Sequence, residues 1–157
     1  MGVSVKRFLS TAVLGLAATA LSITPAMAAP PEPVPTVPGG VTLEECGFDV
    51  QATRSGKVKF LELQQGVKVL FPKQRVTLTN PDTDVSVTYV IAGQLSATPT
   101  DTGETLSFTG HNLVVGPGIG ILYTTGNQTF VVDLEDGTTT LTESHGEVVN
   151  VCDVLAP

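Results

Sequence analysis

Two histidines, His111 and His145, are the side chains best suited to acid–base or metal chemistry. A histidine base needs a hydroxyl nucleophile and an orienting carboxylate, and Ser107 and Ser144 lie outside any glycine-flanked nucleophile turn. Glu143 could join the histidines in a metal site, but the three residues lack a short ligand spacing. We interpret both histidines as surface turn residues and predict neither a catalytic centre nor a metal centre.

Acidic residues cluster in two expected turns, with Asp82 and Asp84 in one and Asp133, Glu135 and Asp136 in the other. A calcium loop needs more oxygen ligands than either cluster supplies, whereas Asp is favoured in turns for local reasons. Glycoside hydrolysis needs two carboxylates in a sugar-binding cleft, and the chain has no Trp and only 2 Tyr. These clusters therefore predict turns and no bound cofactor.

The chain has two cysteines, Cys46 and Cys152, one near each end of the expected domain. An even cysteine count in an exported protein indicates a disulfide. In the chain-entropy model, closing a loop of about a hundred residues stabilises the fold by roughly 4 to 5 kcal/mol. We predict that the two cysteines are bonded to each other.

The first segment, residues 1–28, has the pattern of a secretory signal peptide. Lys6 and Arg7 precede an apolar run over residues 8–20, and Ala26-Met27-Ala28 offers a cleavage site. The run is too short to span a membrane. Residues 29–45 are rich in proline, which favours an extended, solvated chain. We expect a signal peptide, then a stiff or disordered tether, and a secreted mature protein without a transmembrane segment.

Removing residues 1–28 leaves 6 of the 8 basic residues and all 15 acidic ones, so the mature net charge is 6 minus 15, or −9. This acidity argues against nucleic acid and anionic membranes as partners. The remaining basic residues cluster between Arg54 and Arg75. We interpret this cluster as ordinary solvated strand faces.

Short segments of alternating apolar and polar residues, rich in Val and Thr, predict an all-β fold. We expect Ser55-Gly56 to form a hairpin turn, Pro72 and Gly110 to end strands, and Asp136-Gly137 to form another hairpin. The last strand is predicted over residues 148–152.

Short connections between these strands favour an antiparallel meander. Residues 46–157 are therefore predicted to form one domain, a meander that closes into a small β-barrel, with a two-sheet β-sandwich as the alternative. In the barrel, the disulfide would join the first strand to the last.

Four motifs carry a likeness to a known group of proteins. They are Cys46-Gly47-Phe48, Thr109-Gly110-His111-Asn112-Leu113, Gly118-Ile119-Gly120 followed by Tyr123, and Val151-Cys152-Asp153-Val154-Leu155. With these motifs the chain resembles small secreted proteins of unknown function from actinobacteria. The resemblance implies an exported β-domain with a terminal disulfide and implies no activity. Members of the group carry arginine where this chain has His111, a further reason not to assign catalysis to it.

We therefore expect a secreted, non-catalytic β-domain whose partner is unknown, and an interaction with the cell envelope or an extracellular molecule. A carrier of a small apolar ligand is the alternative, because a barrel can hold one ligand in its interior. Its lining would include Phe60, Phe108, Tyr123 and Phe130. A third hypothesis is an isomerase- or cyclase-like barrel enzyme.

Overall fold

The computed structural model describes residues 29–34 and 40–157, so the predicted signal peptide lies outside the described residues. The described chain is built from ten strands and one short helix. Their bounds are β1 (Glu32–Pro33), β2 (Val41–Leu43), β3 (Val50–Leu63), β4 (Gly66–Thr79), β5 (Ser86–Pro99), β6 (Gly103–Gly116), β7 (Gly120–Thr124), β8 (Asn127–Asp133), β9 (Thr139–His145), β10 (Val148–Asn150) and α1 (Val151–Leu155). The predicted all-β class is confirmed.

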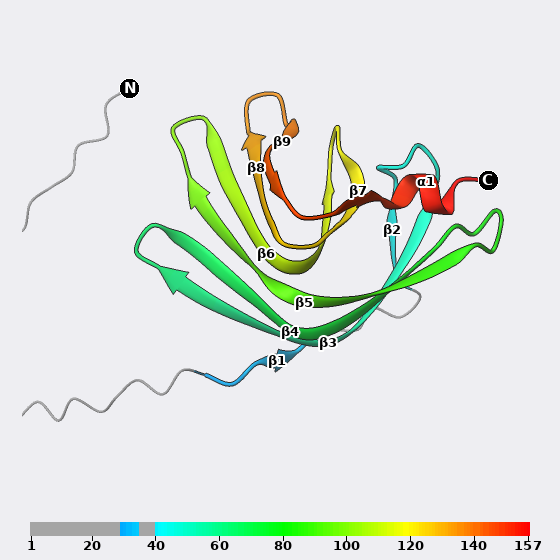
Figure 1. Cartoon of the computed structure of the whole chain (residues 1–157), viewed down its shortest axis with the longest axis horizontal. Helices are drawn as coiled ribbons and strands as arrows, with labels where there is room; N and C mark the ends of the chain where they lie inside the picture. Colours follow the sequence, from blue (N-terminus) through cyan, green and yellow to red (C-terminus); the bar gives the residue numbers. More distant parts are fainter. Residues whose placement is uncertain (1–28, 35–39) are drawn as a thin grey trace, which may run out of the picture.

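Strands β3 to β6 form an antiparallel meander of four long strands, each of 14 residues. The short strands β1 and β2 pair with β3, and at the other side β8 pairs with both β6 and β9. Figure 1 shows these strands curling into a trough. No pairing within the described residues joins β3 to β9 or β10, so the sheet is open and the predicted barrel closure is not confirmed.

The sheet bends sharply where β5 faces β6 through two glycines, Gly93 and Gly110. Gly110 has φ +86°, and a Cβ there would lie 2.7 Å from the Ala92 carbonyl oxygen. Beyond His111, β6 leaves β5 and pairs with β7 instead. The prediction that Gly110 ends a strand is therefore wrong, because a left-handed glycine allows the strand to turn a corner and continue.

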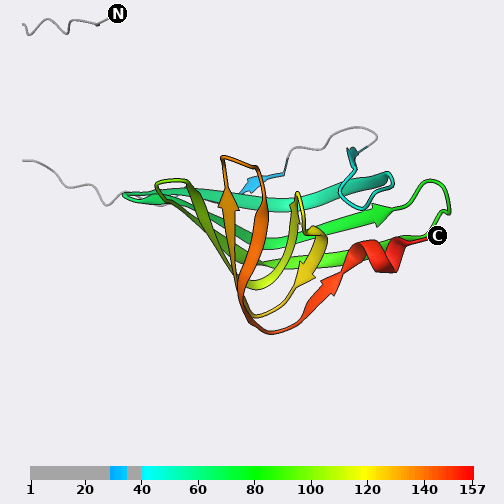
Figure 2. The same ribbon diagram turned by 90° about the horizontal axis from the view of Figure 1, so that it is seen from above.

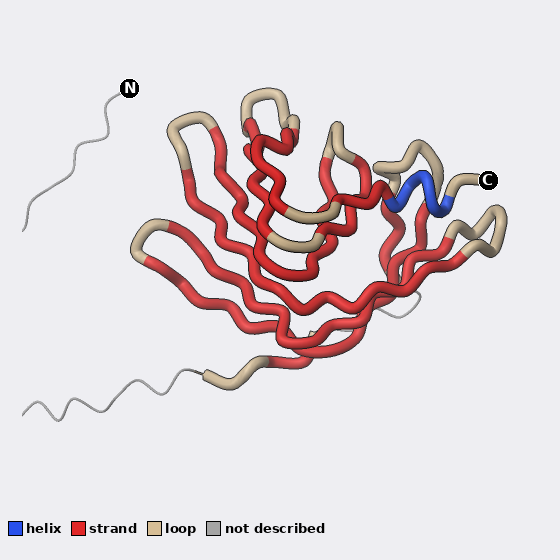
Figure 3. Tube along the Cα trace, in the orientation of Figure 1, coloured by secondary structure: helices blue, strands red, loops and turns tan. Residues whose placement is uncertain are grey.

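This corner creates a second layer of β7, β10 and the end of β6, which packs with α1 against the inner face of β3 to β5. In Figure 2, which views the chain from above, the red C-terminal segment lies beside the long strands. Figure 3 shows α1 in blue at the end of this segment. The main core lies between the layers. Its buried members are Val50, Val76, Leu78, Ile91, Ile121, Val151 and Leu155.

Two predicted chain breaks within the first long hairpin, which β3 and β4 form, are wrong. Ser55-Gly56 does not form a turn, because β3 passes through it and the chain reverses at Gln64 and Gln65. Pro72 does not end β4, because the β4 register shifts between Phe71 and Gln74. A β-bulge leaves a residue outside the regular ladder, so it accommodates a proline, which has no N–H to donate.

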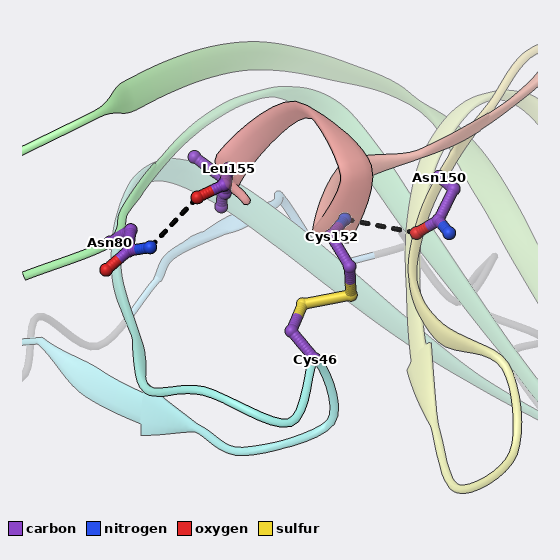
Figure 4. The surroundings of a disulfide bond; sticks show 5 residues. All are labelled: Cys46, Asn80, Asn150, Cys152 and Leu155. Atoms are coloured by element: carbon purple, nitrogen blue, oxygen red, sulfur yellow. Dashed lines mark hydrogen bonds between the residues drawn. A yellow bond between two sulfur atoms is a disulfide. The ribbon is translucent and has the colours of Figure 1, made fainter. Parts of the chain in front are cut away.

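The end of the chain also differs from the prediction. Strand β10 stops at Asn150, whose side chain caps α1 by accepting a hydrogen bond of 3.1 Å from the Cys152 N–H. An Asn cap satisfies a helix donor that would otherwise lack a partner. The predicted Cys46–Cys152 disulfide is present, with Cα atoms 5.2 Å apart. It joins the β2–β3 loop to α1 (Figure 4) and not the first strand to the last.

Part of the proline-rich segment lies on the sheet. Strands β1 and β2 both fall within residues 29–45, which we expected to be a tether. The Val34 N–H donates a hydrogen bond of 2.9 Å to the Gly56 carbonyl, and the Val34 side chain is buried against Val58 and Val69. Apolar contact and edge pairing thus hold this part of the segment against β3.

Candidate functional site

The four aromatic residues predicted to line one ligand cavity lie in three separate places. Phe108 and Phe130 pack edge to face in the core, with ring centroids 5.6 Å apart. Phe60 lies on β3 and is 65 % exposed. Tyr123 lies on β7 and stacks on Tyr89 of β5. The structure therefore does not bring the four residues together around one ligand.

Tyr89, Tyr123 and His111 form a cluster where β6 separates from β5. The two phenol rings stack with centroids 4.3 Å apart, and the Tyr123 hydroxyl lies 2.6 Å from His111 Nδ1. Partial burial, and then the neighbouring Tyr123, raise the pKa of Tyr89. Sequence reasoning missed Tyr89, although its place in a period-two strand predicted an inward side chain. The Tyr89–Tyr123 stack joins β5 to β7 of the second layer, and the phenol–imidazole hydrogen bond links β7 to β6 at the corner.

The remaining residues considered for acid–base or metal chemistry are dispersed or locally satisfied. Within residues 29–34 and 40–157, no group of three His, Cys, Asp or Glu side chains could hold a metal ion. Asp133 accepts a hydrogen bond from the Glu135 N–H, and Asp136 accepts two from Thr138, which lower the pKa of Asp136. The second acidic cluster thus shapes the β8–β9 turn.

The inner face of the first hairpin carries an apolar groove beside β1. Its volume is about 350 Å³, and its lining residues are Val34, Arg54, Val58, Phe60, Val69, Phe71 and Gln74. The second layer covers the other half of this inner face, where the main core lies. Because Phe60 is 65 % exposed at this groove, the groove opens to solvent.

The outer face of the same hairpin carries five of the six basic residues described. Lys57 and Lys59 lie on β3, and Lys68, Lys73 and Arg75 lie on β4. Side chains alternate between the faces of a strand. Between the pairs Lys57–Lys73 and Lys59–Leu70, however, two residues of β4 oppose one residue of β3. This bulge changes the alternation and places Lys68 on the face that carries Lys73 and Arg75.

Arg54, the sixth basic residue, lies on the inner face. It pairs across the ladder with Val76, a core residue, and it lines the apolar groove. Since Glu62 pairs with Val67 on this inner face as well, the one acidic residue of the hairpin is on the side opposite the five cations. We call the five cations Lys57, Lys59, Lys68, Lys73 and Arg75 the basic outer face.

Comparison with known proteins adds no relative: no family model, curated protein or solved structure matches this chain. In the part of the chain that the structure describes, no helix is long and apolar enough to cross a membrane. The Cys46–Cys152 disulfide fits an extracellular protein.

Proposed function

We propose that this protein is a secreted, non-catalytic binding domain that acts at the cell envelope or on extracellular partners. The observation that carries the proposal is the outer face of the open sheet, which no other element of the described chain covers. An antiparallel sheet can pack one face on a core and leave the other to solvent. Here the solvated face is wide and its chemistry is sorted along the sheet.

Across the outer face, the side chains change from basic on β3 and β4 to hydroxyl-bearing on β5, β6 and β8. Next to the basic outer face, β5 contains no charged residue. The outward side chains of β5, β6 and β8 include Thr88, Ser96, Thr98, Thr105, Ser107, Thr109 and Thr129. Threonine is stiff at χ1, so these hydroxyls are held in rows. A rigid, polar, partly cationic surface supports binding to a polar partner outside the cell.

The test is a binding measurement with the secreted protein. Protein collected from the culture medium after expression of the full chain is mixed with envelopes isolated from the producing cells and sedimented. Saturable co-sedimentation that unlabelled protein displaces supports the proposal. Robust turnover of a small substrate, lost on substitution of His111 or His145, together with no binding to envelopes, would remove it.

A second function, carriage of a small apolar ligand, is favoured by the groove beside β1. Its volume of about 350 Å³ and its apolar lining suit a small ligand. We expect the fluorescent apolar probe N-phenylnaphthylamine to bind wild-type protein and to bind Phe60→Ser at least fivefold more weakly. Val90→Ser, at an exposed valine of the outer face, is the control. Equal binding by both variants would reject the groove as a carrier site.

A further inference from the structure

We propose that the basic outer face binds a linear polymer that carries phosphate groups along its backbone and has no nucleobases. This inference rests on the proposed function and names the chemistry of its partner.

None of the five cations has an acidic cross-strand partner in the ladder, and two of them lie directly opposite each other. Lys57 lies directly opposite Lys73, and the cross-strand neighbours of the other three are Ser, Leu and Val residues. Like charges directly opposite each other destabilise a sheet. The fold therefore keeps a repulsive pair that a bound anion would relieve, and a purely structural role gives no reason for that pair.

The acidic character of the whole protein does not cancel the positive potential here. Glu32 of the neighbouring strand β1 pairs with Val58 and therefore lies on the inner face. On the outer face, the acidic residues met along the sheet from β4 are Asp133 on β8 and Glu143 on β9, three and four strands away. Strand spacing places them about 14 and 19 Å away, whereas the Debye length at physiological salt is about 8 Å. The basic outer face thus acts on a nearby anion as a separate positive surface.

The geometry favours a chain of phosphates. Residues two apart on a strand are separated by about 6.7 Å, so Lys57 and Lys59 can meet successive charges of an extended polymer. Four of the five cations are lysines, which contact phosphate as point charges and do not need the planar, bidentate geometry of an arginine–carboxylate pair. The cations form two parallel rows on β3 and β4, which suits a linear ligand.

A shallow depression lies beside the rows. Its volume is about 180 Å³, and it is lined by Ser55, Gly56, Lys73, Gln74, Arg75 and Val90. Ser55, Lys73 and Arg75 supply its outward side chains, whereas Gly56 pairs with Gln74 at an inner-face position of the ladder. A phosphate seated there would meet a hydroxyl, an ammonium and a guanidinium group, all of which donate hydrogen bonds.

The experiment measures binding of the secreted protein to synthetic poly(glycerol phosphate) as a function of salt. For single-stranded polyanions, log K falls by about 0.7 per neutralised phosphate for each unit of log salt concentration. Five contacts predict a slope of roughly −3.5. The double substitution Lys57→Gln and Lys73→Gln should reduce the slope to roughly −2.1 and weaken binding roughly 10- to 30-fold at 50 mM salt.

The matched control is Arg54→Gln, which removes one charge from the same hairpin on the opposite face. Its affinity should stay within twofold of wild type. The thermal midpoint of the double variant should equal or exceed that of wild type, because its substitutions remove a repulsion. Absence of binding to poly(glycerol phosphate) at low salt, or equal losses in the double variant and in Arg54→Gln, would overturn the inference.

Two further probes separate the chemistry from general attraction to polyanions. Poly-glutamate of equal length tests carboxylates, and a single-stranded oligonucleotide tests a phosphate chain with bases. Tighter binding of either than of poly(glycerol phosphate) would reject the assignment. Envelope binding that persists unchanged in the double variant would also reject it but leave the proposed function standing, whereas wild-type protein that fails to bind envelopes would contradict the proposed function itself.

Discussion

The disulfide between Cys46 and Cys152 gives the most direct test of how this fold is stabilised. Replacing both cysteines by serine removes one covalent link and little buried surface. Helix α1 stays anchored in that variant, because Val151 and Leu155 remain in the core and Asn80 donates a hydrogen bond of 2.9 Å to the Leu155 carbonyl (Figure 4). The native structure should therefore persist, and most of the effect should fall on the unfolded chain.

The magnitude follows from the size of the loop that the disulfide closes. The two cysteines are 106 residues apart. In the chain-entropy model, a loop of that length lowers the entropy of the unfolded state by about 16 cal/mol/K, which is about 4.8 kcal/mol at 25 °C. A single domain is stable by about 5 to 15 kcal/mol, so the double variant should lose a large part of its stability.

Urea unfolding followed by circular dichroism measures the effect. With a urea dependence of about 2 kcal/mol per M, the midpoint should fall by roughly 2 to 3 M. Reductant supplies the control, because it should lower the midpoint of wild-type protein to that of the serine variant and leave the variant unchanged.

A small shift would refute this reasoning. If the midpoint of the double variant falls by less than roughly 0.5 M, which corresponds to about 1 kcal/mol, the link does not restrict the unfolded chain as the loop length requires. Residual structure that already holds the chain ends together in urea would then be the physical explanation, and the unfolded state would need direct study.

Three further predictions concern single positions. Gly110→Ala should lower the free energy of unfolding by at least about 2 kcal/mol, since it combines a left-handed φ with a backbone clash. The control Gly137→Ala, at φ +73° with open space around its Cβ, should lower it by only about 1 to 2 kcal/mol. Equal losses of the two variants in urea unfolding would contradict the role of Gly110 in turning β6 through the corner. Asn80→Ala should destabilise the fold by about 1 to 3 kcal/mol, because it leaves two backbone groups without partners; a neutral result in urea unfolding would show that water replaces them. Thr138→Val should raise the pKa of Asp136 towards 3.8. Since the folded pKa lies below that value, the Asp136 contribution to stability is present above pH 3.8 and is lost as the pH falls through the folded pKa. An NMR titration that gives Asp136 the same pKa in wild type and in Thr138→Val would contradict the role of Thr138.

Strand content and several turns were predictable because their causes are local. Val and Thr favour strands wherever one face is buried. Asp136-Gly137 supplies a left-handed glycine and an aspartate that binds the backbone two residues later, so a hairpin turn forms there in the structure as predicted. The disulfide was predictable because two cysteines permit only one intramolecular pairing.

Predictions of strand ends from local residue types were wrong where a long strand continues through a glycine or a proline. Ser55-Gly56 and Pro72 both have the chemistry of a chain break, but pairing with neighbouring strands carries β3 and β4 through them. The prediction of a strand up to residue 152 was wrong for another reason. Asn150 caps a helix whose residues Val151 and Leu155 lie in the main core, and this burial outweighs the strand propensity of valine.

The residue types alone predicted an acidic all-β domain with one disulfide and with its basic residues confined to one stretch. Which face of the sheet those basic residues share depends on the register of the folded strands. With strict alternation along β4, Lys68 would lie on the face opposite to Lys73 and Arg75. The bulge between Phe71 and Gln74 reverses that alternation, because one extra residue shifts every later side chain of a strand to the other face.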